Sequence, residues 1–201
     1  MATWHSDPAL TFPYAEFPDD LQVMVHDGEP RRTQKQPEAC FVRITGIAGT
    51  LRIPSAPQGT PPPLTADKLT FTERPIYTAT VLNKPHHLTT VRAMESIYFV
   101  TSPGVPHPVH VTAQYLRERP QWSLTPCNKC GADQALDPMS VMAATRFPNA
   151  PGGAVPIMFS AFCPCGGTQM LAMTELPPGV APGSTASASG DGKKPWWKFW
   201  N

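Results

Sequence analysis

The sequence contains no apolar run of the about 18 residues that a helix needs to span a bilayer. Residues 1–7 have neither a basic segment nor an apolar one, so a secretory signal is not expected. Charged residues make up only 15% of the chain and the formal net charge is +1, which gives no overall signature of polyanion binding. We therefore predict a cytoplasmic protein.

Several motifs of catalytic sites are also absent. The sequence has no Gly-x-x-x-x-Gly-Lys or Gly-x-Gly-x-x-Gly phosphate loop, no Gly-x-Ser-x-Gly nucleophile turn and no His-Glu-x-x-His zinc motif. Their absence removes the usual reasons to propose an enzyme without excluding one. The sequence favours a non-enzymatic role.

Proline is abundant, and this composition argues against long helices. The chain has 26 prolines, above the roughly 5% typical of soluble proteins, and proline blocks helix interiors. Apolar and β-branched runs predict strands instead, at 21–25, 40–45, 50–53, 69–72, 76–82 and 96–100. Gly46 and Gly49 suggest a turn between the second and third of these strands. The predicted fold is mainly β (α+β), with a small antiparallel β-barrel or twisted sheet over residues 20–120.

The second of these runs alternates cleanly between two faces. Cys40, Val42 and Ile44 share one face, and Arg43 and Thr45 share the other, which is the pattern of a half-buried strand. Cys40 is therefore interpreted as a small core residue. The alternative is a catalytic thiol.

Two short helices are expected near the end of the β-rich region and after it. Residues 111–119 can form about two turns before Pro120 ends them. Asp137 is expected to cap a second helix with Pro138 in its first turn, and Pro148 ends that helix after Arg146.

Four of the five cysteines form two close pairs, Cys127 with Cys130 and Cys163 with Cys165, and glycine follows each pair. In a chain without a secretory signal, this arrangement favours metal binding over a disulfide framework. Thiolates suit zinc, which is borderline-soft and has no preferred d-electron geometry. Strands predicted at 155–162 and 168–173 enter and leave the second pair, as in a ribbon hairpin.

The run Cys127-Asn128-Lys129-Cys130-Gly131 resembles one half of the rubredoxin and zinc-ribbon families, over about residues 121–176. This resemblance implies a zinc-ribbon-like subdomain with structural Zn²⁺ on Cys127, Cys130, Cys163 and Cys165. The families use Cys-Pro-x-Cys-Gly in the second half, whereas Cys163-Pro164-Cys165-Gly166 is one residue shorter and must be distorted. One alternative is an altered site, in which histidine or water replaces one cysteine. The others are an empty site and a redox disulfide.

Residues 85–92 with Ile97-Tyr98-Phe99, inside the 20–120 region, resemble uncharacterised bacterial β-domains of unknown function, and this resemblance implies no activity. Histidines also cluster in this part of the sequence. They can form a second metal site or an acid–base pair with Glu95, or they can cap turns, which we favour. These histidines are His86, His87, His107 and His110.

The C-terminal residues 195–201 follow a Pro/Gly/Ser/Ala-rich linker at 177–194, which is expected to be flexible. They hold four large aromatic residues, Trp196, Trp197, Phe199 and Trp200. So short a peptide does not fold alone, and burial of aromatic rings is strongly favourable, so another surface is expected to cover it. That surface can be a groove on the chain's own domain, a membrane interface or, as we favour, a protein partner.

The predicted organisation is an irregular arm at 1–19, a β-rich domain at 20–120, the ribbon-like subdomain at 121–176, the linker, and the disordered aromatic tail. The hypothesis is a non-enzymatic adaptor or partner-binding protein with a structural zinc site. A metalloenzyme with an incompletely coordinated zinc is one alternative. The other is a nucleic-acid-associated zinc-ribbon protein that uses Arg31, Arg32, Lys35, Arg117, Arg119 and Lys129.

Overall fold

The computed structural model describes residues 4–55, 69–150 and 155–174. Its strands are β1 (Asp20–Val25), β2 (Glu38–Ser55), β3 (Thr70–Val81), β4 (Ser96–Val100), β5 (Val109–Val111), β6 (Trp122–Leu124), β7 (Met158–Phe162) and β8 (Thr168–Met173). Its helical segments are η1 (Trp4–Ser6), α1 (Pro30–Thr33), α2 (Ala113–Glu118), η3 (Arg119–Gln121) and α3 (Met139–Arg146). The predicted linker and aromatic tail lie outside the described residues.

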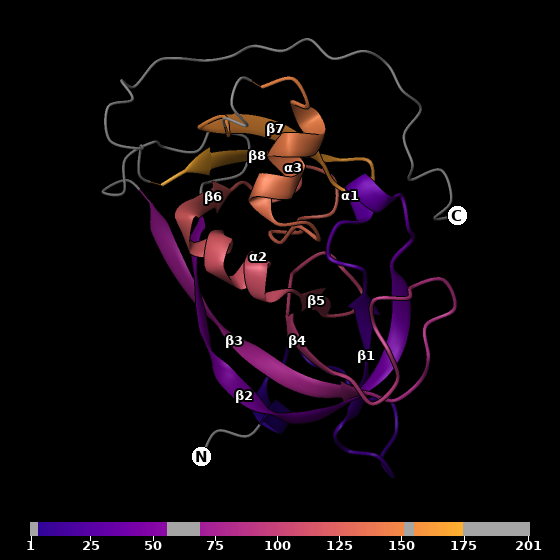
Figure 1. The fold of residues 1–201 in the computed structure, drawn as a ribbon. Helices are drawn as coiled ribbons and strands as arrows, with labels where there is room; N and C mark the ends of the chain where they lie inside the picture. The colour runs from indigo at the N-terminus through magenta and orange to yellow at the C-terminus, as the bar shows by residue number, and fades with distance from the viewer. Residues whose placement is uncertain (1–3, 56–68, 151–154, 175–201) are drawn as a thin grey trace.

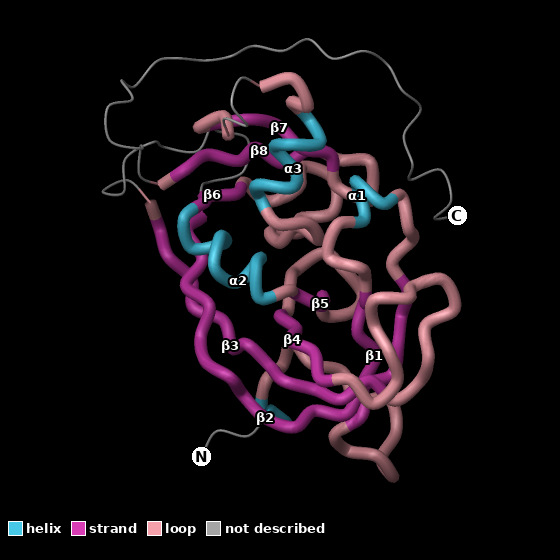
Figure 2. The backbone as a smooth tube through the Cα atoms, viewed as in Figure 1, coloured by secondary structure: helices cyan, strands magenta, loops and turns pink. Residues whose placement is uncertain are grey.

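Five strands close into a barrel in the order β1-β5-β4-β3-β2, because β2 also pairs with β1. The prediction of a mainly β fold with a small barrel is confirmed. The pairs are antiparallel except at the seam between β1 and β5, where the strands run parallel and meet at Met24 and Val109. Figure 2 shows helices α1, α2 and α3 at the end of the barrel that carries β7 and β8.

The long strands β2 and β3 extend beyond the barrel, and β6, β8 and β7 continue the sheet from the far end of β2 (Figure 1). The turn expected between two strands at Gly46 and Gly49 is not formed. Instead, the pairing with β3 shifts register next to each glycine, so the two predicted strands are one bulged strand. The strands predicted at 69–72 and 76–82 are likewise a single strand, β3.

Two clusters of buried apolar side chains pack against this sheet. The first lies inside the barrel and includes the predicted inward face of β2, with Cys40 only 1% exposed. The second lies under α2 and α3 and includes Leu51 and Ile53 of β2 together with Tyr115 and Met139 of the helices. Strand β2 therefore contributes to both cores.

The two predicted helices are present, with one correction. Thr112 caps α2, since its side chain accepts a hydrogen bond from the Tyr115 N–H. The prediction that Asp137 caps α3 is wrong, because the helix begins at Met139 after Pro138 at the cap position. The Asp137 carboxylate instead accepts a hydrogen bond from the main-chain N–H of Arg31 at 3.0 Å. Among the described residues, none of the helices has the length and apolar character required to cross a membrane.

Candidate metal centre

The two cysteine pairs come together in the structure. All four Sγ atoms lie within 4.8 Å of one another. The Sγ atoms of Cys127 and Cys165 are 3.5 Å apart and those of Cys130 and Cys163 are 3.7 Å apart. A tetrahedral zinc with Zn–S bonds of about 2.3 Å places its sulfurs about 3.8 Å from each other, so the cluster has the size that such an ion requires. All four cysteines are free thiols, so no disulfide links them.

The first pair is held by a tight main-chain turn. The Gly131 N–H donates to the Cys127 carbonyl at 2.9 Å, and the Cys127 N–H donates to the Ala132 carbonyl at 2.8 Å. Gly131 has a φ of 81°, a left-handed conformation that glycine adopts without strain. The Lys129 N–H also lies 3.5 Å from the Cys127 sulfur.

The second pair forms a turn one residue shorter. The Gly166 N–H donates to the Cys163 carbonyl at 2.9 Å, and the Cys163 N–H donates to the Gly167 carbonyl at 2.8 Å. This shorter turn still brings both sulfurs into the cluster. At Gly167, a Cβ atom would overlap the Cys127 sulfur and crowd Lys129, so the site requires glycine there.

The cysteines differ in electrostatic environment. Burial opposes the Cys127 thiolate, but the N–H groups of Cys130 and Lys129 outweigh it and lower the pKa of this thiol to about 7. Burial raises the pKa of Cys130 to about 11, and it also raises the pKa of Cys163. A bound cation favours the thiolate form of all four.

A barrel loop covers the cluster. Gly104, between β4 and β5, approaches so closely that a Cβ there would overlap the Cys130 carbonyl group. Val105 packs against the cysteines from the same loop. The Arg74 guanidinium of β3 pairs with the Asp133 carboxylate, which also accepts a hydrogen bond from Ser102 Oγ at 3.1 Å. The turn that carries Cys127 and Cys130, which we call the first knuckle, is thus bound to the barrel by packing and by an ion pair.

Arg31 similarly binds the turn that carries Cys163 and Cys165, which we call the second knuckle. Its guanidinium donates to the carbonyl of Phe162, which precedes Cys163, and lies 3.4 Å from the Asp137 carboxylate. Burial lowers the pKa of Arg31, while Asp137 and Cys163 act in the opposite direction. Sequence reasoning missed this contact because it joins residues more than a hundred positions apart.

The basic residues considered for nucleic acid do not share one exposed face. The Arg31 side chain is only 12% exposed. Arg119 is fully buried and donates to the main-chain carbonyls of Trp122 and Asp133. The remaining four lie at the surface or half-buried, and they are Arg32, Lys35, Arg117 and Lys129.

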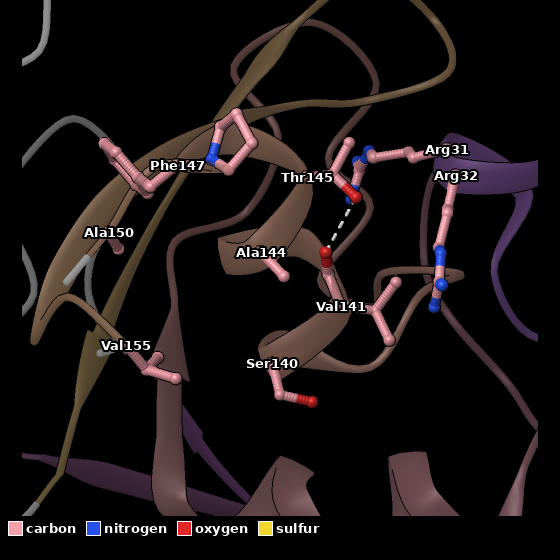
Figure 3. Close-up of a pocket in the computed structure, with 10 residues that line it drawn as sticks. Arg31, Arg32, Ser140, Val141, Ala144, Thr145, Phe147, Ala150 and Val155 are labelled. Atoms are coloured by element: carbon pink, nitrogen blue, oxygen red, sulfur yellow. Dashed lines mark hydrogen bonds between the residues drawn. The ribbon is translucent and has the colours of Figure 1, made fainter. Parts of the chain in front are cut away.

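Two cavities lie at this end of the molecule, and one of them borders the candidate centre. One, of about 620 Å³, is lined by Cys130, Cys163 and Cys165 together with His107 and Lys129. The other, of about 710 Å³, lies between α1 and α3. Figure 3 shows Arg31 and Arg32 beside side chains of α3, where Thr145 Oγ1 donates to the Val141 carbonyl at 2.8 Å.

The histidines do not form a second metal site among the described residues, where the cysteines are the only group of three or more ligands placed closely enough. His86 and His87 lie in a turn whose N–H groups donate to the Glu38 carboxylate. His110 pairs instead with His26, a residue that no sequence motif marks. Cys40 is not an activated nucleophile, because burial raises the pKa of its thiol.

Comparison of this chain with protein-family models, with curated proteins and with solved structures finds no match. Membership of the zinc-ribbon families and the resemblance of residues 20–120 to bacterial β-domains therefore stay predictions. The predicted tail residues Trp196, Trp197, Phe199 and Trp200 lie outside the described residues. The feature of the described residues that bears on function is the geometry of the four cysteines.

Proposed function

We propose that this chain is a non-enzymatic partner-binding protein in which Cys127, Cys130, Cys163 and Cys165 hold one structural zinc ion. The observation that supports this most strongly is the spacing of the sulfurs, 3.5 and 3.7 Å across the two knuckles. Four thiolates complete a tetrahedral shell and leave no position for water or substrate, as in structural zinc sites.

The donor set supports zinc over harder cations. Four thiolates do not suit magnesium or calcium, which prefer oxygen ligands. Iron accepts the same four ligands, so the metal has to be identified by analysis. An ion at this position would join the β7–β8 hairpin, the first knuckle and the barrel loop that holds Gly104 and Val105.

The test is the metal content of the full chain purified without added zinc. We expect about one zinc per chain, and loss of that zinc in both Cys163→Ser and Cys165→Ser variants. Cys40→Ala is the matched control, because Cys40 lies in the barrel core and should leave the zinc content unchanged. Iron in place of zinc, or no metal, would refute the proposed centre.

Partner binding is proposed to run through the aromatic tail. A variant with Trp196, Trp197, Phe199 and Trp200 all replaced by alanine should keep its zinc and its fold. Chemical cross-linking in cells should then recover one defined protein with the natural chain and not with the variant. Tail-dependent binding to anionic vesicles, without such a protein, would reassign the tail to a membrane surface.

A metalloenzyme is the second candidate, and the cavity of about 620 Å³ beside the cysteines favours it. His107 lines this cavity together with Cys130, Cys163 and Cys165. If the centre were catalytic, zinc-dependent hydrolysis of p-nitrophenyl acetate would be lost in His107→Ala while the zinc content stayed constant. Activity that is absent, or unaffected by this substitution, would remove the second candidate.

A further inference from the structure

A cavity of about 250 Å³ lies at the seam of the barrel, where the end of β1 meets β4, β5 and the start of α2. We call it the seam cavity. Strand pairing at the seam is limited to Met24 and Val109, and a pair of histidines extends the contact beyond it. The rings of His26 and His110 are 4.9 Å apart. Both residues line the seam cavity.

The hydrogen bonds define the proton positions on both rings. A carbonyl oxygen can only accept, so His26 Nε2 donates to the His110 carbonyl at 2.6 Å and His110 Nδ1 donates to the His26 carbonyl at 3.1 Å. The Gly28 N–H donates to His26 Nδ1 at 3.0 Å, so His26 is fully satisfied as a neutral ring. A neutral His110 then carries a lone pair on Nε2.

His110 Nε2 has no hydrogen-bond partner among the described residues, although the residue is only 8% exposed. This nitrogen is also not among the fully enclosed polar atoms without partners. It therefore has access to open space, and the open space that His110 lines is the seam cavity. A buried acceptor in this position is suited to an N–H or O–H donor.

Among the residues that the structure describes, the charged side chains that line the seam cavity are Asp27 and Glu95, with no lysine or arginine. Asp27 Oδ2 is buried and has no hydrogen-bond partner among the described residues. The Glu95 carboxylate accepts a hydrogen bond from the Arg92 N–H at 2.8 Å and acts on His110 electrostatically. Because Asp27 Oδ2 is fully enclosed, the cavity combines an imidazole acceptor with the exposed carboxylate of Glu95.

We propose that the seam cavity binds a small organic ammonium ion, whose N–H group donates to His110 Nε2 and whose charge is matched by the Glu95 carboxylate. A metal ion fits less well, because within the described part of the chain His110, Asp27 and Glu95 are not close enough to form a three-ligand site. An anion would be repelled by the Glu95 carboxylate, and the side-chain donors in the lining are uncharged hydroxyl groups such as that of Ser96. A volume below the roughly 300–1,000 Å³ of typical ligand pockets restricts the ligand to a small molecule.

The test uses the ¹⁵N-labelled full chain and n-butylammonium chloride as the probe, followed by NMR of the histidine ring nitrogens. We expect the free protein to show His110 protonated on Nδ1, and a saturable shift of Nε2 with a dissociation constant on the order of 1 mM. Sodium chloride and n-butanol control for ionic strength and for the apolar part of the probe. Neither should produce the shift.

Glu95→Gln is the informative variant, because Glu95 is exposed and glutamine keeps an acceptor for the Arg92 N–H. It should weaken binding at least about threefold. Glu73→Gln, at an exposed carboxylate on β3 that does not line the cavity, should not change binding. The proposal is overturned if Nε2 carries the proton in the free protein, if butanol produces the same saturable shift, or if Glu95→Gln binds as the natural chain does.

Discussion

The barrel and the cysteine-bearing end of the sheet are stabilised by different means. The barrel encloses a continuous cluster of buried apolar side chains from β1, β2, β3 and β4. The knuckle region has a cluster whose buried members are Cys127, Ala132 and Cys163. The second apolar cluster, with Phe159 of β7 and Leu171 of β8, also packs at this end of the sheet. The buried groups of Arg31, Arg74 and Arg119 add polar contacts. Burial of apolar surface supports both regions, but the knuckle region depends in addition on the proposed metal and on charged hydrogen bonds.

Removing the metal should therefore affect the two regions unequally. Structural zinc contributes an apparent folding free energy of about 10–16 kcal/mol in small peptides at neutral pH. After chelation, the amides of β7 and β8 should lose protection from hydrogen exchange while those of β1, β3 and β4 keep it. Equal loss of protection in both regions would show that the barrel depends on the metal as well.

The contact between the regions can be tested at Gly104. Its φ of 73° and its approach to the Cys130 carbonyl mean that Gly104→Ala combines backbone strain with steric overlap. We expect the free energy of unfolding to fall by about 3 kcal/mol or more.

Gly131→Ala is the matched control for this substitution. Gly131 also has a positive φ, of 81°, but a Cβ atom there would meet nothing within 4 Å. The expected cost is about 1–2 kcal/mol, from backbone conformation alone. Denaturant unfolding of the two variants would measure the difference, and equal costs would mean that the loop does not press on the knuckle.

Between pH 6.5 and 5, the barrel seam should give the smallest of these effects on stability, and this effect depends on pH. Burial, with a smaller effect of the neighbouring His110, lowers the pKa of His26 from 6.5 to about 3. The unfolded chain therefore binds this proton first, so the stability from neutral His26 is complete above pH 6.5 and is lost as the pH falls towards 3. We expect a loss of up to about 1.4 kcal/mol for each pH unit within this range.

Denaturant unfolding of the metal-loaded protein between pH 6.5 and 5 would measure this slope. His26→Asn is the comparison, since it removes the titrating ring and should flatten the slope. A slope that persists in this variant would assign the pH dependence to other groups.

The sequence pattern predicted those features that depend on residues close together in the chain. The alternation around Cys40 gave the inward face of β2 correctly, and the spacing of the cysteine pairs selected the four residues that converge. Gly46 and Gly49 were misinterpreted as a turn, because a bulge and a turn place glycine in the same way and only the partner strand distinguishes them.

The remaining features depend on contacts between distant residues. Examples are the order of the strands around the barrel, the contact of Arg31 with Asp137 and the burial of Arg119. Each requires segments that are separate in the sequence to meet. Aspartate is a common residue at the N-cap of a helix, and arginine is usually found at the surface. Asp137 and Arg31 each find their partner only in the folded chain, so neither role could be inferred from sequence.

The seam between β1 and β5 also bears on the order in which the molecule acquires its structure. His26 and His110, which meet there, are 84 positions apart in the chain. Contacts of such sequence separation form late, because the entropy of closing a long loop is lost before the contact is gained. A growing polypeptide cannot complete its barrel until β5 has been synthesised, and Cys163 and Cys165 follow later still. During translation, the barrel should therefore fold first and serve as the template on which the second knuckle closes.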